Sequence, residues 1–319
     1  MNWTFDMEWT KHGLIFVPDG QQVWNLSHAA VPTVDILDHC WRIYYASRDR
    51  DNRSYTSFID VEIGNPKKVL YIHEQPILPL GKLGTFDDSG VMPSWVTSVG
   101  ALKYLFYTGW TTRATIPYQN SIGLAVSRDG GLTFERYADG PLFGNTLAEP
   151  YFTGTSCVLV EDGLWRNWYL SCTKWEVING RPEPFYHLKY ADSPDGIHWN
   201  RRAQVAIDYQ SEAEAGIARA SVIRKRNGYC MWFCYRSAYD YRTKRENGYR
   251  IGYAESPDGV HWNRRNNISG IDVSPEGWDS QMIAYPHVIK HEDQLFMFYN
   301  GNGFGKSGFG YATAAYYDK

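Results

Sequence analysis

The sequence predicts an all-β fold, a five-bladed β-propeller that occupies residues 1–319 as a single domain. Three series of similar segments recur along the chain with one common period of about 64 residues. Five repeats of that length account for the whole chain, and the spacing typical of amphipathic helices is nearly absent. Three series that share one period indicate a repeat architecture.

The first series is a turn phrase, Ser-x-Asp-Gly, which begins at Ser127, Ser193 and Ser256. An Asp-Gly pair makes a tight turn, because Gly accepts positive φ and Asp can bond its own backbone. A short strand-like segment precedes each phrase, and a fourth copy of that segment alone lies at 309–313. We expect the phrases at the outer turns and their aspartates to be structural.

The second and third series describe two further strands of each repeat. Aromatic strands are expected at 41–45, 102–107, 164–169, 229–233 and 295–299. Segments rich in small residues precede them at 28–34, 90–96, 151–158, 217–223 and 282–289. With the strands that flank the turn phrase, each repeat then holds four antiparallel strands, which is one propeller blade.

The last repeat has no outer strand of its own before the end of the sequence. The segment 5–12 resembles the outer-strand segment 198–202 in its pattern. We therefore expect residues 1–14 to pair with the last blade and close the ring, which removes exposed strand edges.

Composition narrows the range of partners. The net charge of −3 offers no basic excess for a nucleic-acid polymer. No secretion signal and no apolar run long enough for a membrane span is visible. The five Cys are expected to be buried free thiols, which suits a cytoplasmic protein, and we expect neither cofactor nor metal.

Candidate catalytic groups precede the small-residue strands, which would line the central channel. Alignment on the small positions makes Asp88 and Glu149 equivalent, places Glu214 within one residue of them, and puts His28 near the same level. Carboxylates gathered at one mouth shift each other's pKa, which supplies the acid and base that glycosidic cleavage requires. As an alternative, such residues are ordinary solvated loop groups.

Candidate substrate-binding groups come from the same loops and from the turns after the aromatic strands. Arginines there suit a carboxylate or phosphate, and the Trp residues suit the faces of sugars. The expected set is His28, Arg48, Asp49, Trp110, Trp175, Arg219, Arg236, Asp279, Gln281 and His287. Neutralisation of neighbouring acids and packing between blades are the alternative roles.

The layout resembles a superfamily of glycoside hydrolases with five-bladed propellers, which includes arabinanases, invertases, levansucrases and mannoside phosphorylases. The stretches most similar to it are 44–49, 88–94, 107–110 and 149–150. The resemblance implies that Asp88 tunes the site and that Glu149 is the general acid. In the first repeat, Ala30-Val31-Pro32 stands where those families often carry Asp-Pro. This departure fits either the phosphorylase route or a protein that has left glycosidase chemistry altogether.

Two functions follow from the sequence. The first is an enzyme that cleaves or transfers a glycosidic or sugar-phosphate linkage, in polysaccharide or nucleotide-sugar metabolism. The alternative is a carbohydrate-binding propeller without catalysis. In both cases the expected partner is a saccharide or sugar nucleotide.

Overall fold

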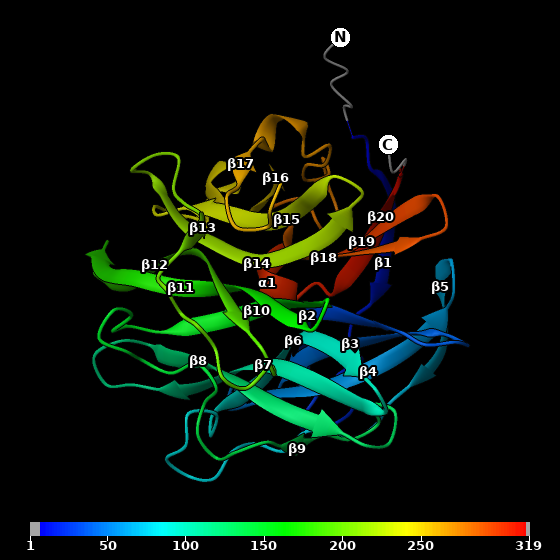
Figure 1. Ribbon diagram of the computed structural model, residues 1–319, viewed down its shortest axis with the longest axis horizontal. Coiled ribbons are helices and arrows are strands. Elements are labelled where there is room, and N and C mark those ends of the chain that lie inside the picture. Colours follow the sequence, from blue (N-terminus) through cyan, green and yellow to red (C-terminus); the bar gives the residue numbers. More distant parts are fainter. Residues whose placement is uncertain (1–6, 317–319) are drawn as a thin grey trace.

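A computed structural model describes residues 7–316, and nearly all of its regular structure is β-strand (Figure 1). One sheet has four strands, in the order β1-β20-β19-β18. Its strands are β18 (Ala284–His291), β19 (Gln294–Asn300), β20 (Phe309–Ala315) and β1 (Thr10–Phe16).

Two further sheets have eight strands each. One contains β2 (Ser27–Ile36), β3 (Trp41–Arg48), β4 (Ser54–Glu62), β5 (Asn65–Ile72), β6 (Gly90–Val99), β7 (Leu102–Thr112), β8 (Tyr118–Ser127) and β9 (Glu135–Arg136). The other contains β10 (Thr153–Glu161), β11 (Leu164–Ile178), β12 (Arg181–Ser193), β13 (Val205–Ile207), β14 (Glu214–Lys225), β15 (Gly228–Ser237), β16 (Arg250–Ser256) and β17 (Asn263–Arg264). Short helical turns lie at α1 (Asn302–Gly305), η1 (Arg245–Asn247) and η2 (Asn266–Ile268).

Each eight-stranded sheet consists of two antiparallel halves of four strands. A single parallel bridge joins the halves, between Ser54 and Gly90 in one sheet and between Tyr186 and Gly216 in the other. The meander of four antiparallel strands predicted for each repeat is therefore the unit of this fold.

The inner strands β2, β6, β10, β14 and β18 contact one another in ring order, and β18 returns to β2. In Figure 1 these strands lie around the middle of the molecule, and the short outer strands lie toward the rim. The β-propeller predicted from the repeats accounts for this arrangement.

The N-terminal strand closes the last sheet as predicted. β1 pairs antiparallel with β20, from Thr10 opposite Thr313 to Phe16 opposite Phe309. The blue strand lies beside the red one in Figure 1. Residues 1–6 of the predicted segment lie outside the described residues.

The turn-phrase aspartates are structural, as expected. In the third phrase, Asp258 Oδ1 accepts the backbone N–H groups of Val260 and His261 at 2.8 Å each. The turn also contacts the neighbouring four-strand group, because Trp168 Nε1 donates to the Gly259 carbonyl at 2.7 Å. Each phrase thus fixes its own turn. The contact of Trp168 also ties two groups of strands together.

The axis of the ring is filled by Arg219, a fully buried side chain of β14. Its guanidinium donates to the Pro32 carbonyl at 3.0 Å and to Thr33 Oγ1 at 2.8 Å, and it contacts Nδ1 of His287 at 3.2 Å. It also donates to the Ser94 carbonyl. One side chain therefore links β14 to β2, β6 and β18.

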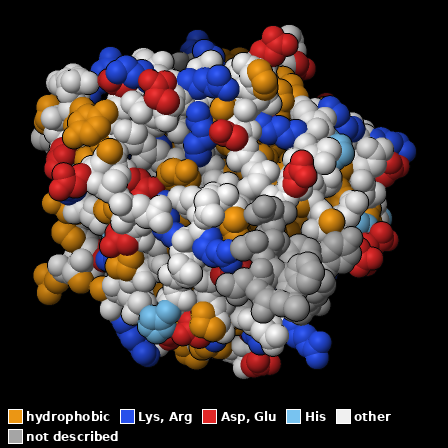
Figure 2. Space-filling view, turned by 90° about the horizontal axis from the view of Figure 1, so that it is seen from above, with side chains coloured by type: hydrophobic (Ala, Val, Ile, Leu, Met, Phe, Trp, Pro, Cys, Tyr) orange, Lys and Arg blue, Asp and Glu red, His pale blue; other side chains and the backbone are white. Residues whose placement is uncertain are grey.

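The five Cys are free and buried, which confirms the expectation for the thiols. On the face seen in Figure 2, basic and acidic side chains are interspersed without a continuous field of one sign. Within residues 7–316, no helix has the length and apolar character needed to cross a membrane.

Candidate functional site

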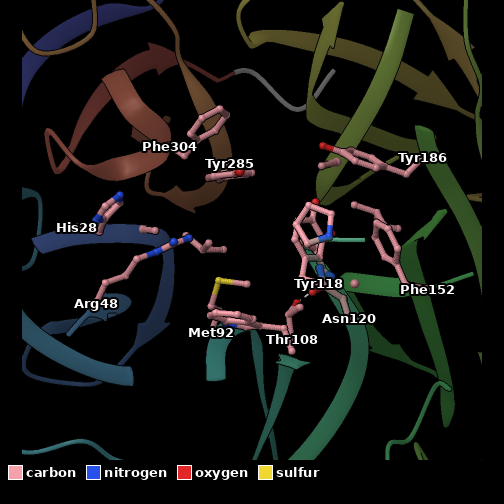
Figure 3. A pocket seen from close by; sticks show the side chains of 18 of the residues that line it. His28, Arg48, Met92, Thr108, Tyr118, Asn120, Phe152, Tyr186, Tyr285 and Phe304 are labelled. Atoms are coloured by element: carbon pink, nitrogen blue, oxygen red, sulfur yellow. Dashed lines mark hydrogen bonds between the residues drawn. The ribbon is translucent and has the colours of Figure 1, made fainter. Parts of the chain in front are cut away.

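A cavity of about 460 Å³ lies where the inner strands and their following loops converge (Figure 3). Its walls are rich in aromatic side chains: Trp110, Tyr118, Phe152, Tyr186, Tyr241, Tyr249, Tyr285 and Phe304. A volume of this size and an aromatic lining are typical of small-molecule sites. In Figure 3, His28 and Arg48 lie on one side and Phe152 and Tyr186 on the other.

The inner strands reach the cavity at irregular points in their ladders. Val31, Thr155 and Tyr285 line it and have φ values of 57°, 25° and 54°. The strand registers shift at each of these points. Such bulges re-aim side chains and are common beside functional sites.

The charged lining is basic. Arg48, Arg236 and Arg242 line the cavity, and Asp51 is the one acidic residue among the described lining residues. Asp51 is exposed and lies 3.5 Å from the guanidinium of Arg53. The cavity therefore presents positive charge together with aromatic surface.

His28 supplies the one imidazole of the described lining. Burial, together with the positive charges of Arg48 and Lys306, lowers the pKa of His28 to about 4. Its Nδ1 lies 2.9 Å from the Ser27 hydroxyl. At neutral pH the ring is uncharged and has one nitrogen able to accept a proton.

The wall tyrosines are neutral hydroxyl groups. Burial raises the pKa of Tyr118, Tyr249 and Tyr285 well above the usual value. They can therefore donate and accept hydrogen bonds while their rings offer flat apolar faces.

The carboxylates chosen from the sequence do not line this cavity. Instead, one acidic residue before an inner strand repeatedly binds a Tyr of the next strand and a basic residue of an outer strand. In the second repeat, Asp87 accepts from Tyr107 Oη at 2.9 Å and from Arg136 Nε at 2.7 Å. Asp87, rather than Asp88, thus holds the position equivalent to Glu149.

Glu149 has the same arrangement in the third repeat. It accepts from Arg201 Nε at 2.8 Å and from Tyr169 Oη at 3.1 Å, and Ser171 Oγ donates at 2.6 Å. Burial alone would raise the pKa of Glu149, but these bonds and the charges of Arg201 and Lys189 lower it. A general acid active at neutral pH needs a shift in the opposite direction.

Glu214 and Asp279 continue the series. Glu214 is held by both terminal nitrogens of Arg264, each at 2.8 Å. Asp279 accepts from Lys11 Nζ at 2.7 Å and from Tyr299 Oη at 3.0 Å. In both places the ion pair fastens the start of an inner strand, or the loop just before it, to the outermost strand of the same group.

Asp88 lies beside this series in the loop before β6. It accepts from the Gly84 backbone N–H at 3.0 Å and from Ser89 Oγ at 2.9 Å. Partial burial opposes ionisation, but the hydrogen bonds outweigh it and lower the pKa of Asp88. Asp88 is therefore ionised at neutral pH.

The cavity brings together four of the residues predicted to bind substrate: His28, Arg48, Trp110 and Arg236. Trp175 packs behind the wall, against Tyr118 and Phe152 at centroid distances of 5.5 and 5.8 Å.

Other predicted binding residues lie apart from the lining. Asp49 is paired with Arg53 at 2.8 Å, and Gln281 is exposed with its backbone N–H bonded to Asn302. Arg219 and His287 are in the axis of the ring, where His287 stacks on Trp95 at 4.5 Å.

The residues that sequence reasoning missed are mainly the tyrosines of the walls, from Tyr118 to Tyr285. They come from three strands and from the connection between β15 and β16, and no spacing marks them in the sequence. The ion-pair series did carry a signal, because Asp87, Glu149 and Asp279 each precede their partner Tyr by an equal interval.

Within residues 7–316, no group of three or more His, Cys, Asp or Glu side chains is arranged to hold a metal ion. The side chains of the lining offer hydrogen bonding, stacking and charge pairing, and His28 offers a neutral imidazole.

Comparison with solved structures defines the class of fold as that of the glycoside hydrolase propellers. A glycosyl hydrolase from Bacteroides ovatus superposes with a TM-score of 0.72 at 13% identity, covering 96% of this chain and 93% of that one. A member of the GH130 family of mannoside phosphorylases and glycoside hydrolases gives 0.71 at 15%, covering 100% and 98%. A thermostable family-43 glycoside hydrolase gives 0.64 at 16%, covering 92% and 90%.

At the sequence level no family model matches the chain. Two proteins of Mycobacterium tuberculosis, the uncharacterized protein MT1551 of strain CDC 1551 and the uncharacterized protein Rv1502 of strain H37Rv, are each 38% identical over 308 residues. The alignments cover 96% of this chain and 99% of each relative. The chain belongs to the family of these mycobacterial proteins.

Proposed function

We propose that this protein recognises a saccharide in the central cavity. The observation that carries the proposal is the cavity itself, with about 460 Å³ enclosed by aromatic side chains at the centre of a glycoside hydrolase fold. Flat aromatic rings stack on the apolar faces of sugars, and the Tyr hydroxyls and Asn120 bond their hydroxyl groups.

Cleavage or transfer of a glycosidic or sugar-phosphate linkage is the second candidate function. His28 favours it, because a neutral imidazole faces the cavity in the first repeat, where the resembled families carry Asp. The assignment of Asp88, Glu149 and Glu214 as catalytic groups stays a prediction. Their positions outside the lining, and the ion pairs of Glu149 and Glu214, make binding the better supported function.

The architecture proposed with this function has five blades in one domain over 1–319. Five inner strands, each followed by its own antiparallel partners, support that count. A cytoplasmic location is part of the same proposal, since five buried free thiols suit a reducing compartment.

The proposal is tested by isothermal titration of neutral oligosaccharides, sugar phosphates and nucleotide sugars, with the products analysed by NMR. Trp110→Ala removes a ring of the wall and should weaken saccharide binding by about tenfold. Tyr137→Ala, which removes an exposed ring outside the lining, is the matched control. Equal affinities for all three proteins would place the binding site elsewhere.

Product analysis separates the two functions. A ligand that binds and is recovered unchanged supports recognition without catalysis. Conversion that disappears in Asp88→Asn or Glu149→Gln, while the ligand still binds the folded variant, would support the enzyme and restore those carboxylates to the site.

A further inference from the structure

Arg236 is the most deeply buried charge of the cavity wall, with 2% of its surface exposed. Its Nε donates to Tyr186 Oη at 3.4 Å, and its terminal nitrogens donate to the Ser237 and Pro184 carbonyls at 2.8 and 3.0 Å. These bonds use three of the five guanidinium N–H groups. One N–H on each terminal nitrogen has no bond within residues 7–316.

The surroundings of Arg236 hold it in place but do not neutralise it. Its guanidinium lies over the rings of Tyr241, Tyr186 and Tyr249, at 3.7, 5.2 and 6.0 Å from their centroids. No carboxylate pairs with it among the described ion pairs. Rings and carbonyls orient the cation, but its full charge remains.

Arg48 enters the cavity from β3 beside His28 (Figure 3). Its Nη1 donates to Asn52 Oδ1 at 2.6 Å, and among the described ion pairs it too has no carboxylate. Arg242, the third arginine of the lining, is paired with Glu183.

Three buried or partly buried arginines outside the cavity lining differ from Arg236 and Arg48, because each is paired with a carboxylate. Arg42 pairs with Asp60, Arg136 with Asp87, and Arg264 with Glu214, at 2.7 to 2.8 Å. A buried charge without a partner is costly, and carboxylates neutralise these three. Arg219 at the ring axis differs, because carbonyls, Thr33 and His287 accept from its guanidinium in place of a carboxylate. The two unpaired arginines of the lining both face the same space.

We propose, building on saccharide recognition, that the ligand of the cavity carries an anionic group, a carboxylate or a phosphate, which Arg236 and Arg48 bind. The guanidinium of Arg236 is fixed before the ligand arrives, so little side-chain entropy is lost on binding. The sugar ring then occupies the aromatic part of the cavity. Uronic acids and sugar phosphates are the ligand classes with this combination.

The test compares matched neutral and charged probes by isothermal titration: glucose, glucuronate, glucose 1-phosphate, UDP-glucose and inorganic phosphate. Charged sugars should bind about 10–100 times more tightly than glucose, since bonds between ions are stronger than neutral ones. The preference should decrease with added salt. Glucuronate against glucose 1-phosphate distinguishes carboxylate from phosphate.

Arg48→Gln and Arg236→Lys are the informative variants, and Arg113→Gln, an exposed arginine near the cavity loops, is the control. Arg48→Gln should remove most of the preference for charged over neutral sugars. Arg236→Lys should reduce this preference even more than Arg48→Gln does, because lysine lacks the planar pair of donors. Near-ultraviolet circular dichroism verifies the fold, and Arg48→Gln keeps the test valid if Arg236→Lys does not fold.

Two different failures can be told apart. Neutral and charged sugars that bind equally, no binding by any charged probe, or unchanged preference in Arg48→Gln would overturn the anionic ligand and leave saccharide recognition standing. A different result would instead overturn saccharide recognition. In that case inorganic phosphate binds, Arg48→Gln weakens its binding, and no sugar phosphate binds more tightly than phosphate itself.

Discussion

At the scale of the residue, the role of Glu149 depends on the groups that contact it. Its side chain is 3% exposed and is surrounded by Arg201, Lys189, Tyr169 and Ser171. These surroundings stabilise the ionised form of the carboxyl group. Removal of its charge would leave Arg201 and Lys189 without their counter-charge. The same residue type at a solvated cavity mouth would be free to exchange a proton.

Glu149→Gln should therefore lower the free energy of unfolding by about 3–5 kcal/mol, because Arg201 and Lys189 lose their counter-charge. Urea unfolding followed by Trp fluorescence measures the change. Glu176→Gln breaks an exposed pair with Lys174 and should cost less than about 1 kcal/mol. A stable Glu149→Gln protein would argue for a functional rather than a structural carboxylate.

At the scale of the element, the Ser-x-Asp-Gly turns connect strands and also contact neighbouring groups. The aspartate accepts backbone N–H groups inside the turn, while in two phrases a backbone carbonyl of the turn accepts from an aromatic side chain elsewhere. Those carbonyls are Gly131, bound by Tyr44 at 2.8 Å, and Gly259, bound by Trp168 at 2.7 Å. A local motif is thereby coupled to the packing of the ring.

Asp258→Ala should lower the unfolding free energy by about 1–2 kcal/mol, since the N–H groups of Val260 and His261 lose their acceptor. Thermal unfolding measures the effect. Asp38→Ala, in the exposed turn between β2 and β3, is the control and should change stability by less than about 0.5 kcal/mol. Equal effects of the two substitutions would show that the turn bonds do not contribute.

At the scale of the whole molecule, the axis joins the inner strands through Arg219 and His287. His287 is 2% exposed, and burial together with the charge of Arg219 lowers its pKa well below the usual value. The unfolded chain takes up a proton on this residue as the pH falls below about 6.5, whereas the folded chain does not. Stability from this group is thus present at neutral pH and is lost as the pH falls.

As the pH falls from about 6.5 to 5, protonation of His287 in the unfolded chain should lower the free energy of unfolding by up to about 1.4 kcal/mol per pH unit. Urea unfolding at several pH values measures this slope, and His287→Gln should reduce it. If the NMR signals of the His287 ring titrate normally near pH 6.5 in the folded protein, this explanation is wrong.

The repeat period, the antiparallel strands, the turn phrases and the buried thiols were all determined by the sequence, because each depends on short-range patterns. The pairing of β1 with β20 also followed, since the last repeat lacked a strand and the N-terminus carried its pattern. The position of binding residues relative to the repeated strands also predicted four residues of the central cavity, namely His28, Arg48, Trp110 and Arg236.

Only the tertiary structure decided which acids are held in ion pairs and which side chains enclose the cavity. Glu149 and Arg201 are 52 residues apart, and Arg219 reaches Thr33 across 186 residues. Contacts at such separations depend on how the groups of strands pack around the axis, which no local pattern encodes. The physical reason is that burial and charge pairing, rather than residue type, set whether a carboxylate or an arginine is available to a ligand.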